Sequence, residues 1–151
     1  MFPPLRRGLS NEKVGVIMGF DIRKIDTKAA AERGLTFELM WEDQPVGINI
    51  TVVGAGSAAY KKHKAIVDGK EANAEKRGKK LTADEREMLY ATLAANCTTG
   101  WEGMELDGKL LEFSVENAIA VYTEFPVIAT QVITKIYSIA EMVGNVEIGQ
   151  N

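Results

Sequence analysis

The chain has 151 residues, 46% hydrophobic and 26% charged, and its 18 basic and 21 acidic residues give a formal net charge of −3. This length suits one domain with a real core and excludes two large ones. Without a basic excess, binding of nucleic acid through general neutralisation of phosphates is excluded as well.

The cellular compartment can be predicted from what the sequence lacks. Cys97 is the only cysteine, which rules out an internal disulfide and fits a reducing compartment. The pair of arginines near the N-terminus is not followed by an apolar run of seven or more, so a secretory signal is not expected. No stretch approaches the roughly 20 apolar residues that cross a bilayer. We therefore expect a soluble cytoplasmic protein that binds neither membranes nor nucleic acid.

The N-terminal third predicts an arm, a short helix and a hairpin. Prolines and glycines interrupt residues 1–20, which predicts a loose arm that could carry a short strand at 14–18. Asp26 or Thr27 can cap a helix over 28–33, with Gly34 as its left-handed stop. The apolar period then becomes two, at 37–41 and 48–52, on either side of the turn-rich link 42–47. These two runs predict one β-hairpin with one apolar face.

Two helices are predicted in the middle of the chain. Ser57 is placed to cap a helix over 58–68, and the highly charged stretch that follows can extend this helix or form a solvated connector. Thr82 and Glu85 form a capping box at the start of a second helix. Its apolar stripe ends at Cys97, which we interpret as a small core residue.

The C-terminal third predicts turns and two more helices. A glycine-rich break at 100–103 is followed by a turn signature at 106–109. Ser114 caps the next helix, and Pro126 begins a last helix that Gly144 is expected to stop.

Together these elements predict an α+β fold: one antiparallel β-hairpin or small sheet followed by a bundle of three to four α-helices. No internal repeat or low-complexity tract divides the chain. We expect a single domain over 21–145, preceded by the N-terminal arm 1–20 and followed by a C-terminal tail at 146–151.

The most suggestive motif is G-x-G-x-x-A at 54–59, between a predicted strand and a predicted helix. Such a segment can hold a pyrophosphate at a helix N-terminus when a second, parallel strand follows the helix. Residues 71–80 are too polar to be that buried strand, and the preceding strand pairs naturally within the hairpin. We favour a plain strand–turn–helix corner. An NAD-binding oxidoreductase ranks a distant third, behind the two hypotheses for function given at the end of this subsection.

Candidate catalytic residues are few. His63, the only histidine, lies among lysines with no partner to orient it as a base, so we interpret it as an exposed helix residue. With one histidine and one cysteine, a zinc site would depend mainly on carboxylates, which structural zinc sites seldom do. No set of nucleophile, base and oxyanion donors can be assembled. We therefore expect no enzyme activity, no cofactor and no metal.

Aromatic residues point to protein binding. Trp101, in the glycine-rich break, can plug a helix corner or anchor a partner, because one ring buries much area at little entropic cost. Trp41 at the hairpin tip admits the same two interpretations. The last helix is apolar over more than one stripe, so it is either central to the core or binds another chain. The candidate partner-binding residues are Trp101, Phe113, Val132 and Ile136.

Three stretches carry a family resemblance. The first is FDIRKID at 20–26 with AERG at 31–34, and the second is VGAGSAAY at 53–60. The third combines TGWEG at 99–103, LDGK at 106–109 and FSVENA at 113–118, followed by FP at 125–126 and QV at 131–132. In this order they resemble the tail assembly chaperones of siphophage-type bacteriophages, over about residues 20–145. The family's usual proline before the Phe-Ser pair is replaced here by Leu111-Glu112, and the N-terminal arm has no counterpart.

The resemblance implies a non-catalytic chaperone that binds the long helical tape measure protein before the tail tube polymerises around it. Such chaperones keep the tape measure protein soluble, recruit the tail tube protein and are then displaced. It further implies a homo-oligomer in the host cytoplasm, absent from the mature virion. The main alternative is a structural tail or neck component that stays in the virion, and a generic host adaptor domain is a further one.

Overall fold

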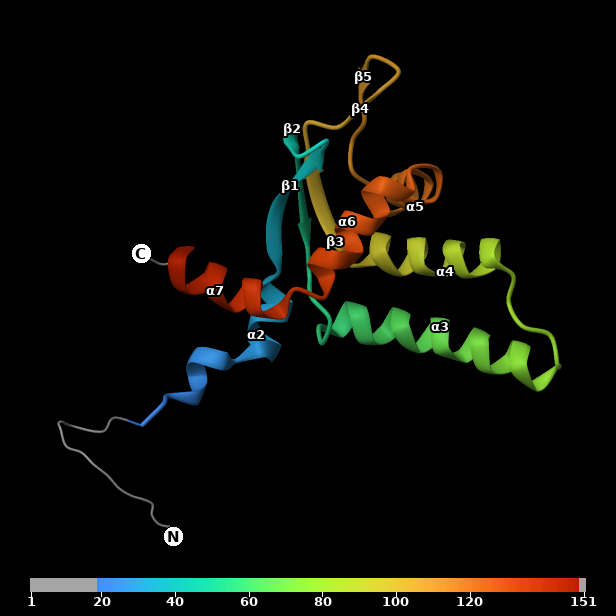
Figure 1. The fold of residues 1–151 in the computed structure, drawn as a ribbon, viewed down its shortest axis with the longest axis horizontal. Coiled ribbons are helices and arrows are strands. Elements are labelled where there is room, and N and C mark those ends of the chain that lie inside the picture. The colour runs from blue at the N-terminus through green and yellow to red at the C-terminus, as the bar shows by residue number, and fades with distance from the viewer. Residues whose placement is uncertain (1–18, 150–151) are drawn as a thin grey trace, which may run out of the picture.

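The computed structural model describes residues 19–149 and confirms the α+β fold: a small antiparallel sheet is followed by several helices (Figure 1). The proposed strand at 14–18 and most of the predicted arm lie outside the described residues. In chain order the elements are η2 (Ile22–Ile25), α2 (Thr27–Arg33), β1 (Leu35–Trp41), β2 (Gln44–Val52), α3 (Ala58–Lys76), α4 (Ala83–Asn96), β3 (Thr98–Glu102), β4 (Glu105–Leu106), β5 (Lys109–Leu110), α5 (Val115–Glu124), α6 (Pro126–Ile136) and α7 (Ile139–Gly149).

The predicted hairpin is present as β1 and β2. Its turn is shorter than the expected link 42–47, because Glu42 and Asp43 both take positive φ angles, 52° and 62°, as a two-residue type I′ turn requires. In the register, Phe37 faces Ile50 across the pair. These side chains are buried, whereas the opposite face of the sheet carries exposed polar residues such as Thr36 and Asn49. The sheet therefore packs on one side only.

The segment at 100–103 was expected to be a break, and this prediction is wrong: it belongs largely to β3, which pairs antiparallel with β2 and places Trp101 beside Ile50. Glycine weakens a strand, but Gly100 is paired with Thr51 of β2. Gly103 ends the strand at φ +82°, and an added Cβ there would overlap the Gly47 carbonyl oxygen. These glycines therefore do not prevent the strand from forming, and Gly103 sets where the strand ends.

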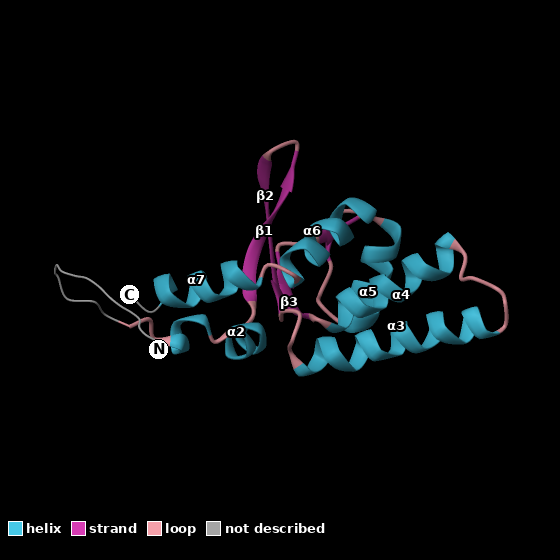
Figure 2. Ribbon diagram, turned by 60° about the horizontal axis from the view of Figure 1, so that its bottom comes forward, coloured by secondary structure: helices cyan, strands magenta, loops and turns pink. Residues whose placement is uncertain are grey.

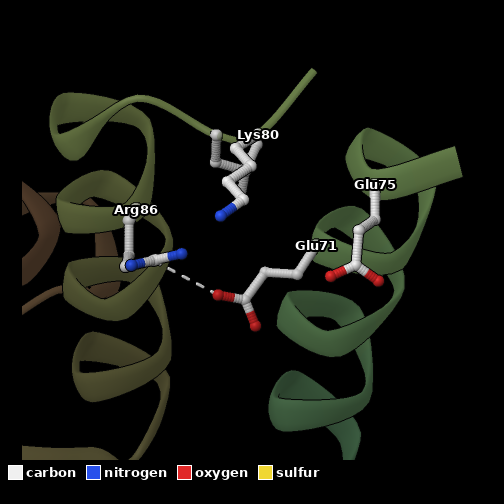
Figure 3. Close-up of a pocket in the computed structure, with 5 residues that line it drawn as sticks. Glu71, Glu75, Lys80 and Arg86 are labelled. Carbon is white, nitrogen blue, oxygen red and sulfur yellow. Dashed lines mark ion pairs between the residues drawn. The ribbon is translucent and has the colours of Figure 1, made fainter. Parts of the chain in front are cut away.

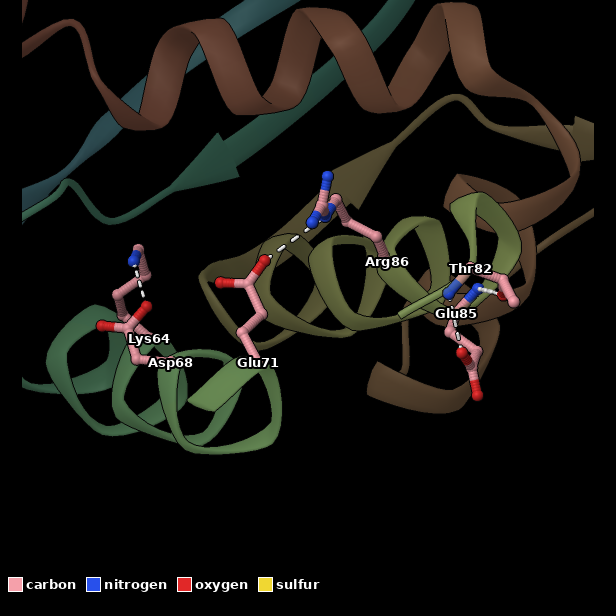
Figure 4. Close-up of polar contacts among 6 residues, drawn as sticks. All are labelled: Lys64, Asp68, Glu71, Thr82, Glu85 and Arg86. Carbon is pink, nitrogen blue, oxygen red and sulfur yellow. Dashed lines mark hydrogen bonds and ion pairs between the residues drawn. The ribbon is translucent and has the colours of Figure 1, made fainter. Parts of the chain in front are cut away.

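Helices α3 and α4 lie side by side and form an arm that extends away from the sheet (Figures 1 and 2). The Ser57 cap of α3 is confirmed, and the charged stretch extends this helix to Lys76 instead of forming a connector. The predicted capping box of α4 is also confirmed: Thr82 Oγ1 accepts from the Glu85 amide at 3.1 Å, and Glu85 Oε1 accepts from the Thr82 amide at 2.8 Å (Figure 4).

The last predicted helix is two helices, α6 and α7. The break follows Ile136, because its carbonyl accepts from the Ala55 amide at 2.8 Å instead of continuing the helical ladder. Tyr137, at the break, contacts Tyr60 on α3 through their hydroxyls, 2.6 Å apart. Gly144 does not stop the helix as expected; α7 runs to Gly149, so the predicted tail at 146–151 begins inside it.

The core lies between the apolar face of the sheet and helices α4, α5 and α6, and its largest fully buried side chain is Tyr122. The Tyr122 hydroxyl lies 2.8 Å from Thr98 Oγ1, which itself donates to the Ala94 carbonyl. Tyr122 is therefore the donor to Thr98, and the buried polar pair is satisfied. Cys97 is fully buried beside it, as predicted.

A buried thiol and a buried phenol, both weak acids, make the fold less stable at high pH. Burial raises the pKa of Cys97 to about 11 and that of Tyr122 to about 12. The unfolded chain loses these protons first as the pH rises, so the free energy of unfolding is expected to fall between about pH 9 and pH 12. As the pH rises to about 11, the free energy of unfolding of Cys97→Ala should fall by roughly 2–3 kcal/mol less than that of the wild type, as measured by urea unfolding. Parallel curves for the two proteins would contradict this assignment.

Candidate partner-binding surface

The G-x-G-x-x-A segment forms the predicted corner between β2 and α3. Both neighbours of β2 are antiparallel, so within residues 19–149 β2 lacks the parallel partner of a dinucleotide fold. Gly54 is buried against α7, where an added Cβ would lie 2.6 Å from Met142 Sδ. Close packing thus explains the glycine at this position.

Several amides of this corner already have partners in the protein. The Ala58 amide donates to Glu32 Oε2 at 2.7 Å, which places a carboxylate at the N-terminus of α3, where a phosphate would otherwise be favoured. Three further amides donate to carbonyls of other segments: Val53 to Cys97, Gly54 to Ala31 and Ala55 to Ile136. The corner is a structural junction, and it lends no support to the oxidoreductase hypothesis.

The candidate reactive residues lie in unreactive surroundings. His63 is half-buried on α3, more than expected, and burial together with the charge of Lys62 lowers the pKa of its imidazole. The raised pKa of Cys97 disfavours the thiolate that nucleophilic chemistry needs. Across the described part of the chain, no group of three or more His, Cys, Asp and Glu side chains could hold a metal.

A polar cleft of about 290 Å³ opens between α3 and α4 (Figure 3). Its wall carries charges of both signs, with Arg86 Nε 3.3 Å from Glu71 Oε2 and with Glu75 and Lys80 nearby (Figure 3). Exposed pairs of this kind stabilise a fold weakly. Because the opposite charges offset each other, the cleft presents no strong electrostatic preference for a ligand.

Trp101 and Phe113, predicted together from the sequence, do meet. Their rings pack edge to face with centroids 5.1 Å apart, and both side chains are half-buried. Trp101 Nε1 donates to the Leu111 carbonyl at 2.8 Å, which fastens the segment after β5 to the sheet. This arrangement lines the tryptophan groove, a surface hollow of about 350 Å³ formed by Trp101, Glu102, Gly103, Leu110, Leu111, Glu112 and Phe113.

Val132 and Ile136 do not belong to this surface. Their exposed fractions are 0% and 2%, because the inner side of α6 packs into the core. Of the two interpretations of the last predicted helix, the core one describes these residues. They are not available to a partner in this fold, so the candidate surface keeps Trp101 and Phe113 only.

The structure adds a second hollow that the sequence did not indicate. We call it the apolar hollow: it has a volume of about 240 Å³ and is lined by Ile48, Met104, Glu105, Leu106, Asp107, Leu111, Val121, Phe125 and Ile128. The hairpin of β4 and β5 contributes Leu106 to the apolar hollow and Leu110 to the tryptophan groove. These leucines are 41% and 69% exposed. The sequence offered one indication of this surface: two leucines flank a tight Asp-Gly turn. Strands of two residues bury little, so these leucines stay largely exposed.

The hairpin tip of β1 and β2 carries further exposed apolar side chains. The Gln131 side chain accepts from the Met40 amide at 2.9 Å and donates to its carbonyl at 2.8 Å, which joins the end of β1 to α6. In Figure 2 this tip stands clear of the helices. The exposed large apolar residues of these elements are Met40, Trp41, Val46, Leu106, Leu110 and Val127.

No protein-family model matches the chain, and neither a curated protein nor a solved structure matches it. No helix between residues 19 and 149 is both long and apolar enough to span a membrane. The class of protein is therefore defined by fold and surface: a small α+β protein with two neighbouring hollows that share Leu111 beside the β4–β5 hairpin.

Trp101 contributes to stability through a hydrogen bond as well as through packing. Trp101→Phe keeps an aromatic ring beside Phe113 but leaves the Leu111 carbonyl without its donor, which should lower the free energy of unfolding by about 1 kcal/mol. The matched control is Trp41→Phe, because Trp41 is 58% exposed and its change should stay within about 0.5 kcal/mol. Equal losses in urea unfolding followed by circular dichroism would argue against a role for this bond.

Proposed function

We propose that this protein is a non-catalytic tail assembly chaperone of a long-tailed bacteriophage, which binds the tape measure protein and promotes assembly of the tail tube around it. The observation that carries the proposal is the pair of neighbouring hollows, the tryptophan groove and the apolar hollow, which share Leu111 beside the exposed leucines of the β4–β5 hairpin. Contiguous exposed apolar surface is typical of protein-binding sites. The order of motifs from residue 20 to residue 132 supports the same assignment.

Binding of this kind requires a surface that accepts the apolar face of a helix. An amphipathic helix docks through side chains about one turn apart, which enter neighbouring hollows. The groove and the hollow flank one small hairpin and share Leu111, so one helix can engage both. Covering the apolar stripe of the tape measure protein keeps that protein soluble until tube subunits replace the chaperone. The protein then acts in the host cytoplasm, as a homo-oligomer along its ligand, and is left out of the virion.

The test is co-expression with the tape measure protein encoded nearby, followed by affinity capture and size-exclusion chromatography. We expect a soluble, stoichiometric complex, and aggregation of the tape measure protein when this chain is omitted. Mass spectrometry of purified virions should not detect the chain. Failure to form the complex, together with its presence in virions, would favour a structural tail or neck component instead.

A further inference from the structure

The apolar hollow lies in an acidic part of the chain. From residue 98 to residue 134 the sequence carries six acidic residues and one basic residue, Lys109. All six acidic residues are exposed, and none takes part in an ion pair described between residues 19 and 149: Glu102, Glu105, Asp107, Glu112, Glu116 and Glu124. Two of them, Glu105 and Asp107, line the hollow itself, and two line the tryptophan groove.

Apolar walls with unpaired acidic groups at their margin define the chemistry of an occupant. The floor of the hollow favours aliphatic or aromatic side chains, which lose exposed area on entry. The carboxylates at the margin favour cations and repel anions, and such complementarity selects partners and orients them. Lysine and arginine on the borders of an apolar helix stripe satisfy both requirements, since their aliphatic stems also cover apolar surface.

We propose that the apolar hollow and its acidic margin bind a basic amphipathic helix: a segment of the tape measure protein whose apolar stripe is bordered by lysine or arginine. This inference rests on the proposed function for the identity of the partner and adds the chemistry of the bound segment. The occupant enters the hollow beside Leu106 and Phe125, with its cations toward Glu105 and Asp107.

Two designed peptides of roughly 20 residues, long enough to form a helix, test the charge preference. They share one apolar stripe, which is bordered by lysine in one peptide and by glutamate in the other. By fluorescence anisotropy the lysine peptide is expected to bind about tenfold more tightly or better. Raising the salt from about 0.1 M to about 1 M, which shortens the screening length from about 10 Å to about 3 Å, should reduce this preference. Equal affinity for both peptides, or no binding of either, would overturn the inference.

The double variant Glu105→Gln/Asp107→Asn locates the site. Asparagine tolerates the positive φ of 54° at position 107, so the turn is preserved. Affinity for the lysine peptide should fall roughly five- to tenfold. The matched control, Glu75→Gln/Glu87→Gln, removes the same charge from exposed sites on the α3–α4 arm and should change affinity by less than about twofold. Equal losses of affinity in the two double variants would show that the peptide does not bind at Glu105 and Asp107.

Capture of the tape measure protein separates this inference from the proposed function. Wild-type protein that captures the tape measure protein, with no loss in the Glu105→Gln/Asp107→Asn variant, would leave the proposed function intact and refute the acidic site. A second copy of this chain is the competing occupant, because its α3–α4 arm carries Lys76, Arg77, Lys79 and Lys80. Self-association that the double variant abolishes, without peptide binding, would assign the hollow to that second copy and overturn the inference.

Discussion

Replacing Gly34 with alanine is expected to lower the free energy of unfolding by roughly 3–5 kcal/mol, enough to unfold much of the protein. Gly34 joins α2 to β1 at φ +81° and ψ −162°, a backbone region that is almost restricted to glycine. An added Cβ would also overlap the carbonyl oxygen of Val52, which belongs to the neighbouring strand. Strands β1 and β2 are both fixed by their pairing, so neither backbone can move away without breaking hydrogen bonds.

The control for Gly34→Ala is Gly78→Ala, in the loop between α3 and α4. Gly78 also has a positive φ, +68°, but an added Cβ would meet nothing within 4 Å. Its substitution therefore adds backbone strain without overlap and should cost about 1 kcal/mol. Urea unfolding followed by circular dichroism measures both variants. A loss at Gly34 no larger than the loss at Gly78 would show that the overlap with Val52 is relieved by movement.

The helix starts could be predicted because their signals are local. The caps at Ser57, Thr82 and Ser114 each depend on a side chain and an amide three residues further along, as the structure shows. The Asp26 cap follows the same rule. Both partners of such a hydrogen bond lie within one turn of the chain, so the sequence indicates them directly.

Two of the wrong element predictions concern contacts between distant segments. The strand at 98–102 forms because β2 offers its free edge, which no pattern within the strand itself reveals. The last helix breaks after Ile136 because the amide of Ala55, far away in sequence, takes its carbonyl. Glycine content and apolar period describe what a segment prefers alone, and here tertiary pairing overrides that preference.

The candidate surface was predicted in part for the same reason. Trp101 and Phe113 are joined by a short stretch of chain, so their meeting could be expected. Val132 and Ile136 share one face of α6, but the sequence does not tell which face turns inward, and theirs does. The apolar hollow draws on β2, β4, α5 and α6, so its existence depends on how these elements pack.

Removing the two leucines of the β4–β5 hairpin is expected to abolish stable capture of the tape measure protein. In Leu106→Ala/Leu110→Ala, both hollows lose a wall at once, and truncating two anchors of an interface costs about 1–2 kcal/mol each, or more than about tenfold in affinity. The fold should be nearly unaffected, because these side chains are 41% and 69% exposed. Co-expression followed by affinity capture measures the loss, and urea unfolding verifies that the variant is folded.

The matched control is Ile66→Ala/Met88→Ala on the α3–α4 arm, where the two side chains are 45% and 47% exposed. It removes a comparable amount of exposed apolar surface far from the hairpin, and capture should persist. If both double variants lost capture alike, general stickiness would explain binding, and the hairpin would have no special role. If only the hairpin variant loses capture, binding depends on where the apolar area lies and not only on how much there is. Such a result requires a specific binding site at the hairpin. That difference separates a chaperone that recognises a helix from a protein that merely exposes apolar surface.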